Sequence, residues 1–199
     1  MPVGESMHLR PTALPKAAAS STDRPLVYVT FGTLFNANPD LFRLVLDALA
    51  DEPIDVVATV GRDQDPAALL PHPANAHVER FVPQADLLPT CSAIVHHGGA
   101  GTMFGALAHG VPQVILPQGA DNFEHAAMCA SAGVGVSLQP DGLDPETLVG
   151  AIRRVLGDAS IAAACGRSAA EIAAMPDASH VVESMREWVA RRATDSSST

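Results

Sequence analysis

Short apolar runs alternate with longer amphipathic stretches along most of this chain. The run from Leu26 to Phe31 is almost continuously apolar and lies between Pro25 and Gly32, which is typical of a strand buried on both faces of a parallel sheet. Further apolar runs predict strands over residues 54–60, 78–82, 94–95, 114–116 and 134–138. Strands that alternate with helices predict an α/β fold with a doubly wound parallel sheet and right-handed crossovers.

The amphipathic stretches predict the helices of this fold. Asn38 is placed to cap a helix that has Pro39 in its first turn, with an apolar stripe formed by Leu41, Phe42, Val45, Leu46 and Leu49. Another helix is expected over residues 100–109. Two or three more are expected between Asp144 and Arg192.

The length of the chain indicates a single domain. At 199 residues it can bury the core of one α/β domain, which we place at residues 24–192. Residues 1–23 are rich in Pro, Ala and Ser and are expected to be a flexible linker. Residues 193–199 are expected to be a disordered tail.

The turn His96–Thr102, with the sequence HHGGAGT, has the clearest functional pattern. It follows an apolar strand and begins a helix, and its small residues let several backbone N–H groups point at one anion. No Lys or Arg occurs between Phe81 and Ile152. The pattern therefore predicts a phosphate site built from backbone N–H groups, hydroxyls and histidine. Gly32-Thr33 and this turn both follow strands, and ligands of such sheets lie at the carboxyl ends of the strands.

Composition excludes several classes of function. A formal net charge of −10 argues against nucleic-acid binding, which depends on Lys and Arg facing phosphates. No apolar run is long enough to span a bilayer and no signal peptide follows Met1, so we expect a cytoplasmic protein that is not bound to membranes. The three cysteines, Cys91, Cys129 and Cys165, are far apart and form no CxxC pair, which disfavours a disulfide or zinc framework.

A series of sequence blocks resembles the donor-binding half of family 1 glycosyltransferases with the GT-B fold. The likeness is to actinobacterial enzymes of the macrolide and polyketide type, which attach sugars to natural products. The blocks occur in the order and at the spacing of that family: VTFGT (29–33), FVPQ (81–84), LLP (87–89), VHHGGAGT (95–102), AL (106–107), GVPQ (110–113) and PQGADN (117–122).

The resemblance implies that the chain is the Rossmann-like C-terminal half of such an enzyme. Residues 24–192 would bind a dTDP- or UDP-sugar without a metal or other cofactor, and residues 9–15 resemble the linker to an N-terminal acceptor domain. In the family the catalytic base lies in that other domain. We therefore expect no catalytic residue in this chain, which would bind the donor without catalysing an inverting single displacement. No feature predicts an oligomeric state.

Residue by residue, the family motif implies three groups of contacts. The donor diphosphate would contact Thr33, His96, Gly98, Gly99, Ala100, Gly101 and Thr102, whereas His97, one position further, would pack. The nucleoside would contact Phe81, Val82, Gln84 and Phe104, and the sugar Asp121 and Asn122. Structural roles stay open beside these: His96 and Phe81 as core residues, Gln84 as a helix cap, and Asp121 as a cap paired with His125.

Phe104 carries a prediction about the nucleotide. Relatives that use UDP-sugars commonly have a Glu here that holds the ribose hydroxyls, and Phe accepts no hydrogen bond. The resemblance therefore favours a dTDP-linked sugar, whose deoxyribose has no 2′-hydroxyl. Alternatively, Phe104 packs with Leu107 on its helix.

Other functions remain possible on the sequence. Asp63-Gln64-Asp65 matches the DxD pattern that holds a divalent metal in the other major glycosyltransferase fold, although a solvated loop is favoured. The chain also fits a non-catalytic nucleotide-sugar-binding module. A third alternative is a GT-B relative that acts on cell-wall lipid intermediates, or a nucleotide-sugar epimerase.

Overall fold

The computed structural model describes residues 23–32, 38–176 and 178–195, and its centre is one parallel sheet. The strand order is β3-β2-β1-β4-β5-β6. This is the order of a doubly wound Rossmann-like sheet. The strands are parallel, and successive strands are added on one side of β1 up to β3 and on its other side from β4 onward. The strands are β1 Leu26–Thr30, β2 Asp55–Thr59, β3 Ala76–Glu79, β4 Ala93–His96, β5 Gln113–Ile115 and β6 Gly135–Ser137.

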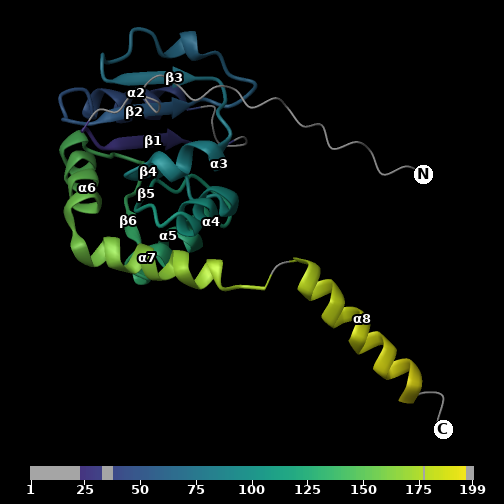
Figure 1. The fold of residues 1–199 in the computed structure, drawn as a ribbon. Coiled ribbons are helices and arrows are strands. Elements are labelled where there is room, and N and C mark those ends of the chain that lie inside the picture. The colour runs from purple at the N-terminus through teal and green to yellow at the C-terminus, as the bar shows by residue number, and fades with distance from the viewer. Residues whose placement is uncertain (1–22, 33–37, 177, 196–199) are drawn as a thin grey trace.

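Helices cover both faces of this sheet (Figure 1). Helices α2 and α6 pack against each other, and α4 contacts α3, α5 and α7. The α-helices are α2 Pro39–Ala48, α3 Gln84–Leu87, α4 Ala100–Ala108, α5 Asn122–Ser131, α6 Pro145–Gly157, α7 Ala159–Ala173 and α8 Ala178–Asp195; η1 Pro66–Leu69 and η2 Leu88–Thr90 are short 3₁₀ helices.

Alternate residues of β1 show why helices cover both faces of the sheet. Val27 and Val29 belong to the larger core cluster, together with residues of α2 and α6. Leu26 and Tyr28 point to the other face and belong to a second cluster with residues of α3 and α4. All five residues of β1 are buried, as expected for a strand with a continuous apolar run.

Helix α2 begins as the sequence predicts. Asn38 is its N-cap, and the side-chain Oδ1 accepts a hydrogen bond of 3.0 Å from the backbone N–H of Leu41. Pro39 occupies the first turn, where a missing N–H costs no intrahelical hydrogen bond. The apolar stripe of this helix packs on the sheet through Phe42, which contacts Phe31 with 4.6 Å between ring centroids.

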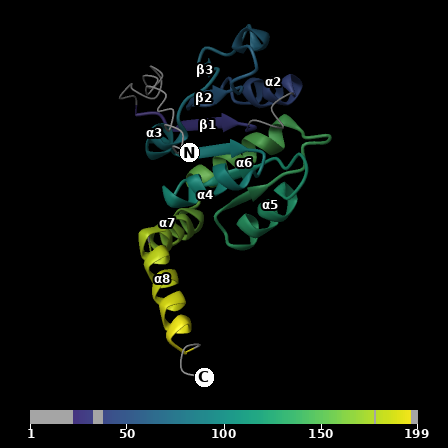
Figure 2. The ribbon, with the colours of Figure 1, turned by 90° about the vertical axis from the view of Figure 1, so that its right-hand side faces the viewer.

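Helix α8 differs from the other long helices because it projects away from the sheet (Figures 1 and 2). Its large apolar side chains are exposed, among them Val181, Met185 and Trp188. No helix within the described residues has both the length and the hydropathy needed to cross a membrane.

Two predicted boundaries were wrong. The strand predicted over residues 78–82 is β3 Ala76–Glu79. Backbone hydrogen bonds from Val60 and Gly61 to the carbonyls of Glu79 and Arg80 extend the pairing just beyond it, and the left-handed backbone of Gly61, with a φ of 96°, marks its end. The tail predicted from residue 193 begins too early, since α8 continues to Asp195. Most of the predicted linker, residues 1–22, and residues 196–199 lie outside the described residues.

Replacement of the α2 cap tests this account of the fold. We expect Asn38→Ala to lower the free energy of unfolding by about 1 kcal/mol, because the N–H of Leu41 loses its acceptor. Urea unfolding followed by circular dichroism measures the change. Asn38→Asp retains an acceptor and should stay within about 0.5 kcal/mol of the unchanged chain. An equal loss in both variants would contradict the capping role.

Candidate functional site

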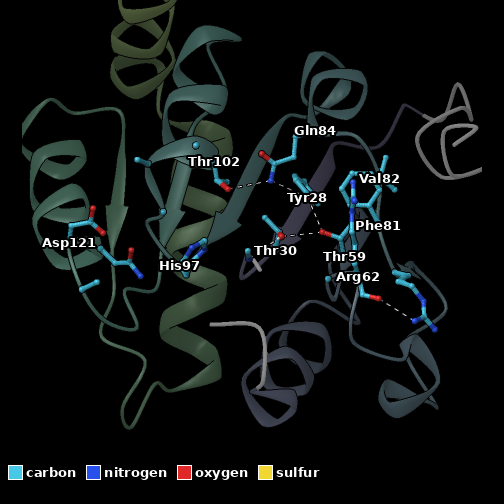
Figure 3. Close-up of a pocket in the computed structure, with 18 residues that line it drawn as sticks. Tyr28, Thr30, Thr59, Arg62, Phe81, Val82, Gln84, His97, Thr102 and Asp121 are labelled. Carbon is cyan, nitrogen blue, oxygen red and sulfur yellow. Dashed lines mark hydrogen bonds between the residues drawn. The ribbon is translucent and has the colours of Figure 1, made fainter. Parts of the chain in front are cut away.

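A cavity of about 550 Å³ opens at the carboxyl ends of the central strands. The residues that line it lie in β1 and β2 or follow β1, β2, β3, β4 and β5, so the cavity spans the point where the strand order reverses. Figure 3 shows how these residues converge from separate segments. They are Tyr28, Thr30, Gly32, Thr59, Gly61, Arg62, Arg80, Phe81, Val82, Gln84, His97, Gly99, Ala100, Gly101, Thr102, Ala120, Asp121 and Asn122.

The N-terminus of helix α4 forms one wall of the cavity. Gly99 is the N-cap residue and provides no side-chain cap, and the first helical backbone bond runs from the Met103 N–H to the Gly99 carbonyl. The preceding N–H groups, of Ala100, Gly101 and Thr102, therefore have no intrahelical acceptor. Gly101 is exposed, and a Cβ added there would meet no atom within 4 Å. This wall can accept an anion on backbone N–H groups and the positive end of the helix dipole.

The ring of His97 lines the cavity and is held between two glycines. A Cβ on Gly32 would lie 2.5 Å from the ring Cε1, and a Cβ on Gly99 would also collide with the ring. Gly32 has a φ of 74°, a conformation that favours glycine. Burial lowers the pKa of His97, and the carboxylate of Asp121 opposes that shift. The imidazole is thus a neutral donor or acceptor in a fixed position beside the anion-binding wall.

His96 points away from the cavity, contrary to the role predicted for it. It is fully buried, and its Nε2 lies 2.8 Å from Gln113 Oε1 while its Nδ1 accepts a hydrogen bond from the Gly98 N–H at 3.1 Å. Burial lowers the pKa of His96 to about 3. The strand alternation did predict that the two histidines face opposite ways, but it is the ring of His97 that reaches the cavity.

A chain of hydroxyl groups crosses the floor of the cavity, and the sequence analysis missed it (Figure 3). Tyr28 and Thr59 hydroxyls are 2.8 Å apart, and Thr59 donates to Thr30 at 3.1 Å. Gln84 Nε2 donates to the Thr102 hydroxyl at 3.3 Å and lies 3.5 Å from the Tyr28 hydroxyl. Thr30 and Thr59 are register partners and the last residues of β1 and β2. A threonine at the end of each of two apolar strands was the sequence feature that could have predicted these hydroxyl groups.

Two arginines also reach the cavity, although the phosphate turn itself has no nearby cation in sequence. The Arg62 guanidinium lies 4.4 Å from the centroid of the Phe81 ring, close enough for a cation–π contact. Arg80 donates to the Arg62 carbonyl at 3.3 Å. Arg62 follows the end of β2 and Arg80 follows the end of β3. The rule that ligands bind at the carboxyl ends of the strands, which was applied to the glycine turn, would also have indicated these two arginines.

The start of helix α5 forms the opposite wall. Asp121 is its N-cap residue but makes no side-chain cap bond, and its carboxylate lies 3.9 Å from Nε2 of His125. Asn122 is 2% exposed, and its Nδ2 has no hydrogen-bond partner among the described residues. A buried donor without a partner costs free energy, and Asn122 lines the cavity, so this amide is available to a ligand oxygen.

The family assignment follows from comparison with known proteins. Residues 43–188 match the model of the Erythromycin biosynthesis protein CIII-like C-terminal domain, which is most of the chain. The chain belongs to this family. It is 38% identical over 149 residues to demethyllactenocin mycarosyltransferase of Streptomyces fradiae, a match that covers 75% of the chain and 32% of that enzyme.

Solved glycosyltransferases with the GT-B fold resemble the structure as well. The glycosyltransferase VinC in complex with DTDP has a TM-score of 0.78 and 32% identity, covering 91% of this chain and 45% of that one. The spinosyn rhamnosyltransferase SpnG complexed with thymidine diphosphate also has a TM-score of 0.78 and 32% identity, and the match covers 88% of this chain and 48% of that one. This member of the CIII-like family thus spans less than half the length of these relatives.

Two other predicted positions, Phe104 and Gly98, are not among the residues that line the cavity. Phe104 is 56% exposed on α4 and is not among the residues that line the cavity, so its contact with a nucleoside stays a prediction. Gly98 is buried and its N–H is engaged by His96. Thr33 lies outside the described residues.

The DxD pattern shows no sign of a metal site. The Asp65 side chain accepts a hydrogen bond from the Ala67 N–H and so caps η1. Within the described residues no group of three or more His, Cys, Asp or Glu side chains is placed to hold a metal ion.

The buried His96 makes stability depend on pH. The folded state holds it neutral with a pKa of about 3, whereas an unfolded histidine titrates near 6.5, so the unfolded state binds more protons between these values. The free energy of unfolding should therefore fall as the pH drops from 6.5, by up to about 1.4 kcal/mol per pH unit from this group. Urea unfolding at pH 7 and pH 5 measures the slope.

The slope should be smaller in His96→Asn and unchanged in His109→Asn, which alters an exposed histidine. Ring ¹⁵N signals of the unchanged chain give a second readout. A His96 ring that takes up a proton near pH 6.5 would contradict the assignment.

Proposed function

We propose that this chain is the donor-binding domain of a glycosyltransferase that moves a sugar, in particular a deoxysugar, from a dTDP-sugar to a natural-product acceptor. The observation that carries the proposal is the cavity at the reversal of strand order, where the uncapped N-terminus of α4 meets the ring of His97. Membership of the CIII-like family and the likeness to natural-product glycosyltransferases support it. The acceptor and its binding domain would lie outside the residues of this chain.

The cavity divides into three regions that suit the three parts of such a donor. The diphosphate lies against the N–H groups of Ala100, Gly101 and Thr102, beside His97. The nucleoside lies toward Phe81, where an aromatic ring offers a stacking face. The sugar lies toward Asp121 and Asn122, whose carboxylate and amide complement hydroxyl groups.

The residues of the chain act on the leaving group. Displacement at the anomeric carbon breaks its bond to the diphosphate oxygen, and negative charge grows on the diphosphate as the bond breaks. The fixed N–H groups at the start of α4 and a neutral His97 stabilise that charge without reorganisation. Thr30 also lines the cavity, and its hydroxyl, which accepts from Thr59, would add a further hydrogen-bonding group. An inverting single displacement would take its general base from the acceptor-binding domain.

We further propose that donor binding does not require a divalent metal. Among the described residues that line the cavity, Asp121 is the only carboxylate, and no group of three or more His, Cys, Asp or Glu side chains in the described part of the chain is placed to hold a metal ion. Arg62 and Arg80 supply positive charge instead. Helix N–H groups supply the remaining hydrogen bonds to the phosphate oxygens.

Observations other than the residue at position 104 also support the choice of dTDP over UDP. Both solved neighbours described above contain thymidine diphosphate, which supports a thymidine nucleotide for this family member. Burial of the thymine methyl group in an apolar part of the cavity would contribute up to about 0.8 kcal/mol. Val82 is 2% exposed and lines that part of the cavity next to Phe81.

Calorimetry of the chain with TDP in EDTA tests the proposed function. We expect binding without metal, and TDP should bind more tightly than UDP, with dUDP separating the effect of the methyl group from that of the hydroxyl group. Phe104→Glu, a change on the exposed face of α4, should leave the ratio of TDP to UDP affinity unchanged. Binding that appears only after Mg²⁺ is added would refute the metal-independent site.

His97→Ala should lower the affinity for TDP about tenfold or more, because one hydrogen bond to a charged phosphate contributes about 1.5–3 kcal/mol. Affinity for thymidine, which lacks the diphosphate, should change less than threefold. His109→Ala alters a histidine outside the cavity lining and serves as the control. A His97→Ala chain that binds TDP as tightly as the unchanged chain would show that the ring only packs between Gly32 and Gly99.

A further inference from the structure

Two histidines outside the cavity lining hold the glycine turn from opposite sides. The Gly98 N–H donates to Nδ1 of His96 at 3.1 Å, and the Gly98 carbonyl lies 2.8 Å from Nδ1 of His125. His96 ends strand β4 and His125 lies in the first turns of α5. Both polar groups of Gly98 are therefore taken by imidazole rings that come from different elements.

The hydrogen-bond directions are fixed by what each group can do. A carbonyl only accepts, so Nδ1 of His125 must carry a proton. A backbone N–H only donates, so Nδ1 of His96 must be the acceptor and Nε2 must carry the proton, which it donates to Gln113 Oε1 at 2.8 Å. His125 thus donates a hydrogen bond to Gly98, whereas His96 accepts one from it, and each ring requires a defined tautomer.

The carbonyl of Gly98 belongs to the same planar peptide group as the N–H of Gly99. In a trans peptide these two groups point in opposite directions, so a carbonyl held toward His125 fixes the Gly99 N–H on the opposite side. That N–H has no hydrogen-bond partner among the described residues, and Gly99 lines the cavity. Gly98 has a φ of 92°, so the turn would lose this geometry if the peptide groups rotated.

The same contact joins the two walls of the cavity. His125 lies one turn after Asp121, and a Cβ on Gly98 would lie 2.9 Å from the backbone oxygen of Asn122. The start of α5 therefore packs directly on the glycine turn at the start of α4. A change in the hydrogen bond from His125 would alter the spacing between the proposed diphosphate wall and the proposed sugar wall.

We propose that His125, together with His96, is a positioning residue that aims the N–H groups of the glycine turn at the donor diphosphate by holding the Gly98 peptide groups. This inference deepens the proposed function and depends on it for the identity of the ligand. It assigns the first histidine of the HHGG sequence a role through the backbone. It also adds His125, which the sequence analysis considered only as a partner of Asp121.

The test compares two replacements of His125 that differ in one hydrogen-bond donor. The Asn side chain places an amide N–H where Nδ1 of the histidine lies, whereas Leu has similar bulk and no donor. We expect His125→Asn to bind TDP within threefold of the unchanged chain and His125→Leu to bind it at least tenfold more weakly. Thymidine affinity should change less than threefold in both variants, since the turn faces the diphosphate.

His109→Leu is a matched control. His109 likewise has its Nδ1 near a backbone carbonyl, that of Gly105 at 2.9 Å, but at the far end of α4 and outside the cavity lining. It should leave TDP affinity unchanged. Amide hydrogen exchange of Gly98 provides a readout that needs no ligand: we expect faster exchange in His125→Leu and near-normal exchange in His125→Asn.

The outcomes separate the two proposals. If the unchanged chain does not bind TDP, the proposed function fails, while the exchange of Gly98 still tests the positioning role. If the unchanged chain binds TDP and His125→Leu binds it equally well, the positioning role is overturned. Equal losses of TDP and thymidine affinity in both His125 variants would also overturn it, because they would indicate general loss of packing.

Discussion

The pairing of β1 with β4 is the constraint on which the rest of this structure depends. Thr30 and His96 are register partners at the carboxyl ends of these strands, and the chain order reverses between them. Because of this pairing, the segment after β1 and the segment after β4 leave the sheet side by side. The ring of His97 then fits against Gly32, and helix α4 begins at the edge of the same cavity.

The fold was largely predictable because its signals are local. The apolar run of β1, the cap at Asn38 and the alternation of strands and helices each appear within a few residues of sequence. The end of β3 was not predictable in this way. It depends on where β2 ends and on the turn at Gly61, which are properties of a neighbouring strand.

The candidate site was predicted in its main part, the glycine turn, and missed where residues converge from different strands. The alternation of side chains shows that His96 and His97 face opposite ways, but only the packing on Gly32 shows which ring faces the cavity. Arg62 and the chain of hydroxyl groups were not predicted, because these residues come from the ends of different strands. The exposure of Phe104 was not predictable, because the direction of its side chain depends on the rotation of α4.

The β1–β4 pairing also has a consequence for biosynthesis. Val27 pairs with Ala93, a separation of 66 residues (93 − 27). At a translation rate of about 5–20 residues per second, the ribosome needs roughly 3–13 seconds to add that length of chain. During this interval β1 can pair with β2 alone, and one edge of a strand that is apolar on both faces stays unpaired. A ligand held by the segments after both strands has no complete site until β4 has left the ribosome, so it acts only on the later steps of folding.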